Sequence, residues 1–198
     1  MIPSCNKSRP EYGPLKPDLH GTRHWFLTSD ATWEDRANAL AALADLTQLE
    51  IWSVDESMAR AGAGATHALP AAVARWFDDE SDLFWALEHA MREAQIGVRI
   101  YALGTEPFIW AVRQLAARFA IAPEAVRVAH SGSLRRRVYC IHCRCTNEHV
   151  TSNVVTCKQC GRYLSVRDHF SRRLTAFMGV QADAEVPGEL PESMQHYL

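Results

Sequence analysis

The chain has 198 residues, of which 47% are hydrophobic and 22% charged, and its formal net charge is -2. These values are typical of a folded globular protein and exclude a disordered or fibrous chain. So small a net charge provides no positive field that would draw the protein to nucleic acid or an anionic membrane. No stretch approaches the roughly 20 apolar residues of a membrane span. Residues 1–17 lack the apolar core of a secretory signal, so the sequence predicts a cytoplasmic protein.

The first half of the chain predicts a flexible lead-in followed by alternating strands and helices. Residues 1–22 contain four prolines, which disfavour regular structure. The apolar run 24–27 predicts a buried strand, and Thr32 is a candidate N-cap for a helix that ends near residue 46. Residues 49–54 alternate in polarity and predict a second strand.

The alternation continues to about residue 130. Residues 58–70 predict a loop, and 71–77 one or two helical turns. A helix capped by Ser81 should run to about residue 95 and stop at Gly97. The strand 98–103, a helix that starts at Pro107 and a strand at 126–129 complete the pattern. We therefore expect residues 23–132 to form an α/β domain with a small parallel sheet and flanking helices.

Four cysteines in the last third of the chain form two Cys-x-x-Cys pairs separated by 13 residues: Cys140, Cys143, Cys157 and Cys160. Two such pairs, each in a tight turn, can supply the four thiolates of a tetrahedral zinc cage. A cage of four thiolates leaves no position for water, which favours a structural ion over a catalytic one. Residues 133–166 are therefore expected to form a zinc ribbon.

Two alternatives for this site remain open at this stage. Cys145 is a further thiol that could replace Cys143 as a ligand. A single iron could occupy the same cage and would make it a redox centre. A plant-type [2Fe–2S] cluster is disfavoured, because its third cysteine would fall at Glu148.

The strand 98–103 leads into Gly104-Thr105-Glu106-Pro107-Phe108. Residues 98–129 resemble the nicotinamide-binding half of ferredoxin reductases. The chain departs from that family at Leu103 and Thr105, and it has no Gly-rich phosphate turn after the first strand. We therefore expect a reductase-like scaffold in which Gly104, Thr105 and Glu106 form a vestigial nucleotide turn. An NAD(P)H-binding reductase component is the alternative.

Residues 167–198 predict a C-terminal helix and an extended partner-binding tail. Phe170, Leu174, Phe177 and Met178 recur at helical spacing and would form one apolar face. The tail after Val180 has four acidic residues and no periodicity, so it is expected to be disordered or to lie along a partner. The candidate partner-binding residues are Asp168, His169, Phe170, Arg172, Arg173, Phe177 and Met178.

The two Cys-x-x-Cys pairs and the segment 164–190 together resemble the small subunit of haem-dependent dimethylamine monooxygenase. The resemblance implies an accessory subunit of an enzyme that uses O2 and NADPH to convert dimethylamine to methylamine and formaldehyde. It also implies partners: a haem-bearing catalytic subunit and a reductase subunit with FMN and a [2Fe–2S] cluster. No catalytic residue is predicted in this chain. A zinc-ribbon adaptor that binds protein or nucleic acid is the alternative from another functional class.

Overall fold

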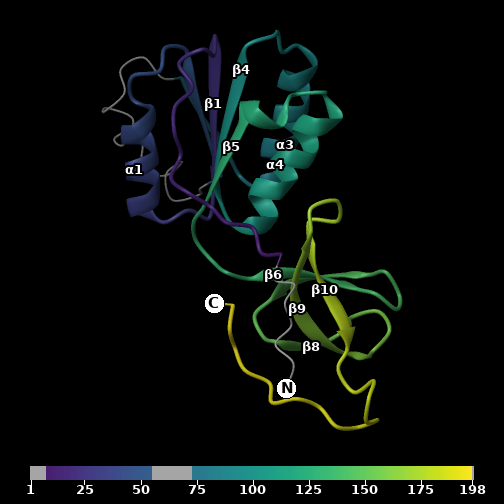
Figure 1. Ribbon diagram of the computed structural model, residues 1–198. Coiled ribbons are helices and arrows are strands. Elements are labelled where there is room, and N and C mark those ends of the chain that lie inside the picture. Colours follow the sequence, from purple (N-terminus) through teal and green to yellow (C-terminus); the bar gives the residue numbers. More distant parts are fainter. Residues whose placement is uncertain (1–7, 55–72, 198) are drawn as a thin grey trace. The chain divides into compact units, whose positions relative to one another are not determined.

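The computed structural model describes residues 8–54 and 73–197 (Figure 1). The chain divides into two compact units, one formed by residues 12–132 and one by residues 133–198 together with the first 11 residues. They are called here the α/β unit and the ribbon unit. Among the described residues, no helix is long and apolar enough to cross a membrane.

The α/β unit contains a five-stranded sheet with the order β3-β2-β1-β4-β5. All four pairings between neighbouring strands are parallel. The strands are β1 (Arg23–Ser29), β2 (Leu49–Val54), β3 (Val73–Phe77), β4 (Val98–Gly104) and β5 (Val126–His130). The predicted α/β class with a parallel sheet and flanking helices is therefore confirmed.

Helices cover both faces of this sheet (Figure 1). They are α1 (Trp33–Leu43), α3 (Glu80–Arg92) and α4 (Glu106–Arg118), and a 3-10 turn, η2 (Pro123–Ala125), precedes β5. On one face, Leu43 of α1 joins the buried core cluster that contains Phe26 and Tyr101 of the sheet. Helices α3 and α4 lie on the other face, where Leu87 and Phe108 are fully buried.

Two local predictions for this unit were wrong. Residues 73–77 form the edge strand β3 rather than helical turns, because the sequence Val-Ala-Arg-Trp-Phe pairs with β2 along its length. Asp79, not Ser81, caps α3 by accepting a hydrogen bond from the amide of Asp82, and the helix ends at Arg92, before Gly97. Thr32 caps α1 as predicted. The predicted loop 58–70 lies outside the described residues.

The segment from residue 8 to 22 is packed, which corrects the prediction of a flexible lead-in. Its prolines exclude regular structure but not burial, and Leu15 is only 6% exposed within the core cluster of α1 and the sheet. The hydroxyl of Tyr12 donates a hydrogen bond to Glu106 (3.0 Å). The α/β unit therefore begins at Tyr12, 11 residues before the predicted boundary at 23.

The ribbon unit contains a second five-stranded sheet, with the order β7-β6-β10-β9-β8. The strands are β6 (Arg136–Cys140), β7 (Thr146–Val150), β8 (Val154–Thr156), β9 (Tyr163–Ser171) and β10 (Ala176–Gln181). The pair β6–β10 is parallel and the other pairs are antiparallel. The ribbon thus extends to residue 181, beyond the predicted end at 166.

The predicted C-terminal helix is instead the hairpin of β9 and β10. Phe170 and Phe177 are direct partners across the two strands, and their rings meet edge to face with centroids 5.1 Å apart. A spacing of seven residues fits both one helix face and two facing strands, so periodicity alone could not separate them. Gly179 does not end a helix: a Cβ there would lie 2.7 Å from Cγ1 of Val138 in the adjacent strand.

The tail also differs from the prediction, because it lies along its own unit. Gln195 forms an antiparallel bridge with Ser152, and the amides of His196 and Tyr197 donate to the carbonyl of Thr151. The amide of Met194 donates to Oδ1 of Asn153 (2.7 Å). The described part of the tail therefore needs no partner chain to be held in place.

Candidate metal centre

Two turns of the same construction carry the four cysteines. In the first, the amide of Arg144 donates to the carbonyl of Cys140, and in the second the amide of Gly161 donates to the carbonyl of Cys157. The two donor residues have φ values of 64° and 71°, in the left-handed region. Glycine reaches this region without strain, whereas Arg144 does so at a cost of about 1 kcal/mol. Each turn thus directs its two thiols toward those of the other.

The four sulfur atoms, from Cys140, Cys143, Cys157 and Cys160, all lie within 4.8 Å of one another. The Cys140–Cys160 sulfur distance is 3.8 Å and the Cys143–Cys157 distance is 3.6 Å. Zn–S bonds of about 2.3 Å at tetrahedral angles place the sulfurs about 3.8 Å apart. The arrangement therefore fits one tetrahedral metal ion bound by four thiolates.

The surroundings of the sulfurs favour a closed site. Cys140 and Cys157 are 0% and 2% exposed, and Leu164 and Val155 pack against the cluster. Such a centre links the end of β6 to the end of β8 and leaves no coordination position for substrate or water. A zinc ion bound here would stabilise the fold and would have no position for a reacting ligand.

Without a metal ion, the pKa values of the cysteine thiols differ widely. The backbone amide of Cys145 lowers the pKa of Cys143, but burial and the three neighbouring thiols outweigh it and raise that pKa to about 12. Burial raises the pKa of Cys157, but the amides of Cys160 and Gln159 and two neighbouring thiols lower it to about 6. Sulfur atoms this close cannot all be thiolates unless a cation neutralises them.

Asn147 supports the cage and was missed by the sequence reasoning. Its side chain is 4% exposed, and Nδ2 donates to the carbonyl of Val138 (3.2 Å) and to the sulfur of Cys157 (3.8 Å). Its Oδ1 accepts the amide of Lys158 (2.9 Å), which fixes the second turn against β7. No spacing rule marks this asparagine in the sequence. Cys145, the alternative ligand, stays outside the cluster and donates weakly to the carbonyl of Thr146.

The segment predicted to be a vestigial nucleotide turn lies where β4 ends and α4 begins. A Cβ on Gly104 would collide with the carbonyl oxygen of Ser29, so this glycine allows β1 and β4 to approach closely. Thr105 occupies the N-cap position of α4 without a side-chain cap bond, and Glu106 accepts from Tyr12. Gly104 and Glu106 therefore both contribute to the packing of the α/β unit.

The adjacent N-terminus of α1 carries a hydrogen-bonded carboxylate and borders a cavity of about 340 Å³ that is lined by Asp35, Leu103 and His130 among others. Asp35 accepts hydrogen bonds from the hydroxyls of Ser131 (2.6 Å) and Thr32 (2.8 Å). The Ser131 hydroxyl, followed by that of Thr32, lowers the pKa of the Asp35 carboxyl, so this group is charged at neutral pH. In dinucleotide-binding folds the pyrophosphate occupies this position, and here it would meet a carboxylate.

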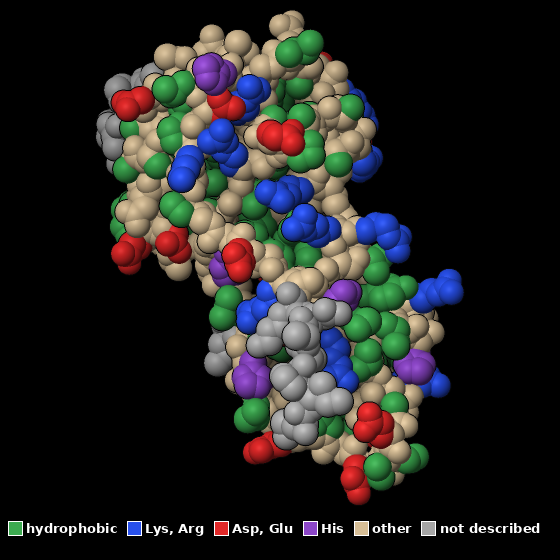
Figure 2. All heavy atoms as spheres, viewed as in Figure 1, with side chains coloured by type: hydrophobic (Ala, Val, Ile, Leu, Met, Phe, Trp, Pro, Cys, Tyr) green, Lys and Arg blue, Asp and Glu red, His purple; other side chains and the backbone are tan. Residues whose placement is uncertain are grey.

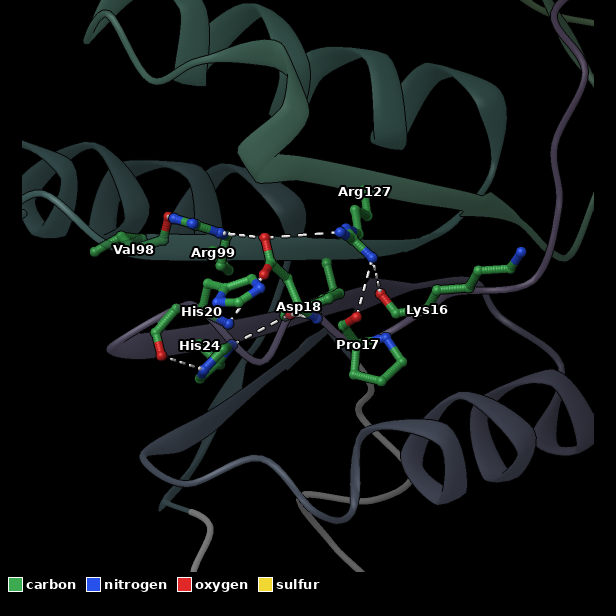
Figure 3. A network of polar contacts seen from close by, with 10 residues as sticks. Lys16, Pro17, Asp18, His20, His24, Val98, Arg99 and Arg127 are labelled. Carbon is green, nitrogen blue, oxygen red and sulfur yellow. Dashed lines mark hydrogen bonds and ion pairs between the residues drawn. The ribbon is translucent and has the colours of Figure 1, made fainter.

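A polar network holds the segment before β1 against the sheet (Figure 3). Asp18 accepts from Nε of Arg99 (2.6 Å), and Nη1 of Arg127 donates to the carbonyls of Lys16 (2.7 Å) and Pro17 (3.1 Å). Burial lowers the pKa of His24, which is 1% exposed, so this imidazole is neutral. The charges of the network are paired, which indicates a structural clamp.

The predicted partner-binding residues separate into buried and exposed groups. Asp168 forms an ion pair with Arg136 (2.8 Å), His169 contacts Ser8, and Phe170 and Phe177 are buried. Arg172 and Arg173 lie exposed in the β9–β10 turn, and Met178 is half-buried.

Arg136 explains why this region is internal. Its guanidinium is stacked between the rings of Phe177 (3.9 Å) and Tyr197 (3.8 Å).

Comparison with known proteins places the chain in a family. The N-terminal and C-terminal domains described for dimethylamine monooxygenase subunit DmmA-like proteins match residues 5–126 and 137–180. The heme-dependent oxidative N-demethylase delta subunit of Ectopseudomonas mendocina (strain ymp) is 35% identical over 111 residues, which are 56% of this chain and 63% of that protein. No solved structure matches the chain. The chain therefore belongs to the DmmA-like family of dimethylamine monooxygenase subunits.

Proposed function

We propose that this chain is an accessory subunit of a haem-dependent, multi-subunit oxygenase that oxidatively demethylates dimethylamine. The complex would consume O2 and NADPH and release methylamine, formaldehyde and water. The family match and the 35% identity to an oxidative N-demethylase delta subunit support this reaction class. A haem-bearing subunit would perform the oxidation, and a subunit with FMN and a [2Fe–2S] cluster would supply the electrons.

One observation supports an organising role over a catalytic one. The thiolate cluster is a closed cage, and at the N-terminus of α1 the carboxylate of Asp35 stands where a dinucleotide-binding fold would hold a phosphate. The cage leaves no open coordination position, and the cavity of about 340 Å³ beside Asp35 is lined mostly by apolar residues, among them Leu15, Ala39 and Leu103. The chain would therefore stabilise and align its partners.

The metal is proposed to be zinc, bound by Cys140, Cys143, Cys157 and Cys160. Sulfur separations near 3.8 Å suit Zn2+ and iron alike, and zinc is favoured because two closed Cys-x-x-Cys turns are typical of structural zinc sites. Ligation by free thiolates fits a reducing compartment, so we place the complex in the cytoplasm.

The scaffold is proposed to be a ferredoxin-reductase-like nucleotide fold that no longer binds its nucleotide. The strand order β3-β2-β1-β4-β5 is that of five strands of a dinucleotide-binding sheet. An NAD(P)H-binding reductase component is the second candidate, favoured by this topology and disfavoured by the Asp35 carboxylate.

Reconstitution tests the accessory role. Formaldehyde release from dimethylamine is measured with the purified partner subunits, with this chain alone, and with all of them combined. We expect no activity from the chain alone and full activity only from the combination. Full activity without this chain would contradict the proposal.

A further inference from the structure

Among the described residues of the ribbon unit, none builds a core on one face of its sheet. Side chains alternate along β6, β9 and β10, so Cys140, Leu164 and Phe177 point to the metal side and are buried. Five neighbouring side chains point to the opposite side and are called here the outer face: Tyr139, Ile141, Tyr163, Met178 and Val180.

The register shows that these side chains adjoin one another. Met178 is the direct partner of Tyr139, and Gly179 is the partner of Cys140, so the next residues, Val180 and Ile141, are neighbours in turn. Tyr163 follows on β9, where the amide of Ala182 donates to its carbonyl (2.8 Å). The outer face therefore brings five apolar side chains into adjoining positions, and the polar Ser165, the partner of Val180, lies on the same side.

The outer face is exposed to solvent. Ile141 and Tyr163 are 47% and 46% exposed, and the other three residues are partly exposed. The end of the described tail lies on the opposite side of the sheet, because Tyr197 stacks on Arg136, whose other side packs on the buried ring of Phe177. Contiguous exposed apolar side chains on a folded protein mark interaction surfaces.

The strands of the ribbon unit carry an excess of positive charge. Residues 133–181 contain nine Lys and Arg but only two acidic residues, Glu148 and Asp168, whereas the tail after residue 181 adds four acidic residues. Arg137 lies on the same side of β6 as Tyr139 and is paired with Glu148 (3.0 Å). Arg144, in the first cysteine turn, and Arg167, in β9, are exposed. Figure 2 shows Lys and Arg side chains beside hydrophobic ones on this unit.

We propose that the outer face is the docking surface for another subunit of the oxygenase, and that this subunit presents an apolar patch bordered by Asp and Glu. The proposal rests on the proposed function and specifies the chemistry of the partner. It also moves the predicted docking site from one side of the hairpin to the other. Of the residues first predicted to bind a partner, only Met178 belongs to the outer face.

The apolar centre would supply affinity and the arginines would supply orientation and speed of association. Hot spots of interfaces are enriched in large side chains that lose their solvent on binding, as Tyr163 and Ile141 would. Exposed charges such as Arg144 and Arg167 mainly set the association rate and its dependence on salt.

Binding of the purified chain to each purified partner subunit, measured by surface plasmon resonance, tests the proposal. In the double variant Ile141→Glu, Tyr163→Glu we expect Kd for one partner to rise by about 100-fold or more, since both anchors are lost. The control Trp85→Glu replaces a still more exposed apolar side chain on α3 (68% exposed) with one carboxylate and should change Kd by less than about threefold.

A second variant distinguishes a loss of docking from a loss of the folded structure. Arg144→Gln with Arg167→Gln leaves the apolar surface intact and should weaken binding by about tenfold at low salt but little at about 0.5 M salt. Metal content per chain, measured on each variant, confirms that the cage is intact.

The outcomes separate this proposal from the proposed function. If the wild-type chain binds a partner and both variants bind equally well, the outer face is not the docking surface, although the accessory role stands. If the wild-type chain binds no partner subunit, the accessory role itself fails. Retention of a duplex oligonucleotide, abolished by the arginine variant, would overturn the protein partner in favour of a nucleic acid.

Discussion

Asn147→Ala tests whether the asparagine beside the cysteines supports the metal cage. The substitution removes a donor from the Val138 carbonyl and from the Cys157 sulfur, and an acceptor from the Lys158 amide. A buried group that loses its partner costs about 1–3 kcal/mol, and water can reach the exposed Lys158, so we expect a total near 2 kcal/mol. Because metal binding and folding of a small metal-held unit are linked, this corresponds to about 30-fold weaker metal binding.

Competition with a coloured chelator measures the metal affinity directly. The control is Gln159→Ala, an exposed side chain in the second turn, which should alter the affinity by less than about twofold. An Asn147→Ala protein with wild-type affinity would refute the idea that this amide orients the Cys157 thiolate. Weaker binding in both variants would point to a general loosening of the turn instead.

Three further predictions concern the two units separately. Cys157→Ser should abolish metal binding and unfold the ribbon, while circular dichroism retains the helical signal of the α/β unit; a metal-free ribbon with native near-ultraviolet signal would contradict this. Leu15→Ala should lower the free energy of unfolding of the α/β unit by about 3 kcal/mol in urea titrations followed by tryptophan fluorescence, because Leu15 is buried in its core; no change would show that the segment is not packed. The pKa of Asp35 is lowered in the folded state, so its stabilisation is present above the unfolded value near 4 and is lost as pH falls through the folded one. In Asp35→Asn the free energy of unfolding should therefore fall less steeply with decreasing pH below about pH 4. The same steepness as in the wild type would argue against the hydrogen bond from Ser131.

The sequence predicted best where a strong local rule applied. The repeated Cys-x-x-Cys spacing identified all four residues that the structure brings within 4.8 Å. Thr32 was predicted as a cap because a Thr directly before a helical pattern is typical of a helix N-terminus. In the structure its side chain accepts a hydrogen bond from the amide of Asp35, three residues later. Alternating strands and helices gave the parallel sheet, since each βαβ unit is built from residues close in the chain.

The predictions failed where distant residues decide the structure. The edge strand β3 forms because β2 offers a pairing partner, and Phe170 and Phe177 form a hairpin because β6 lies beside β10. Leu15 is buried although its surroundings in sequence are polar and Pro-rich. Asn147 supports the cage through contacts with residues 9 to 11 positions away that no motif records.

The central claim is that this chain is a metal-stabilised subunit that organises an oxygenase. A tagged pull-down of the chain from its native cells, followed by a visible spectrum and metal analysis, tests it most directly. The account predicts a Soret band with flavin and iron–sulfur absorbance and one zinc ion per copy of this chain. A colourless single chain that carries only zinc, or iron in the thiolate cage without haem, would contradict it.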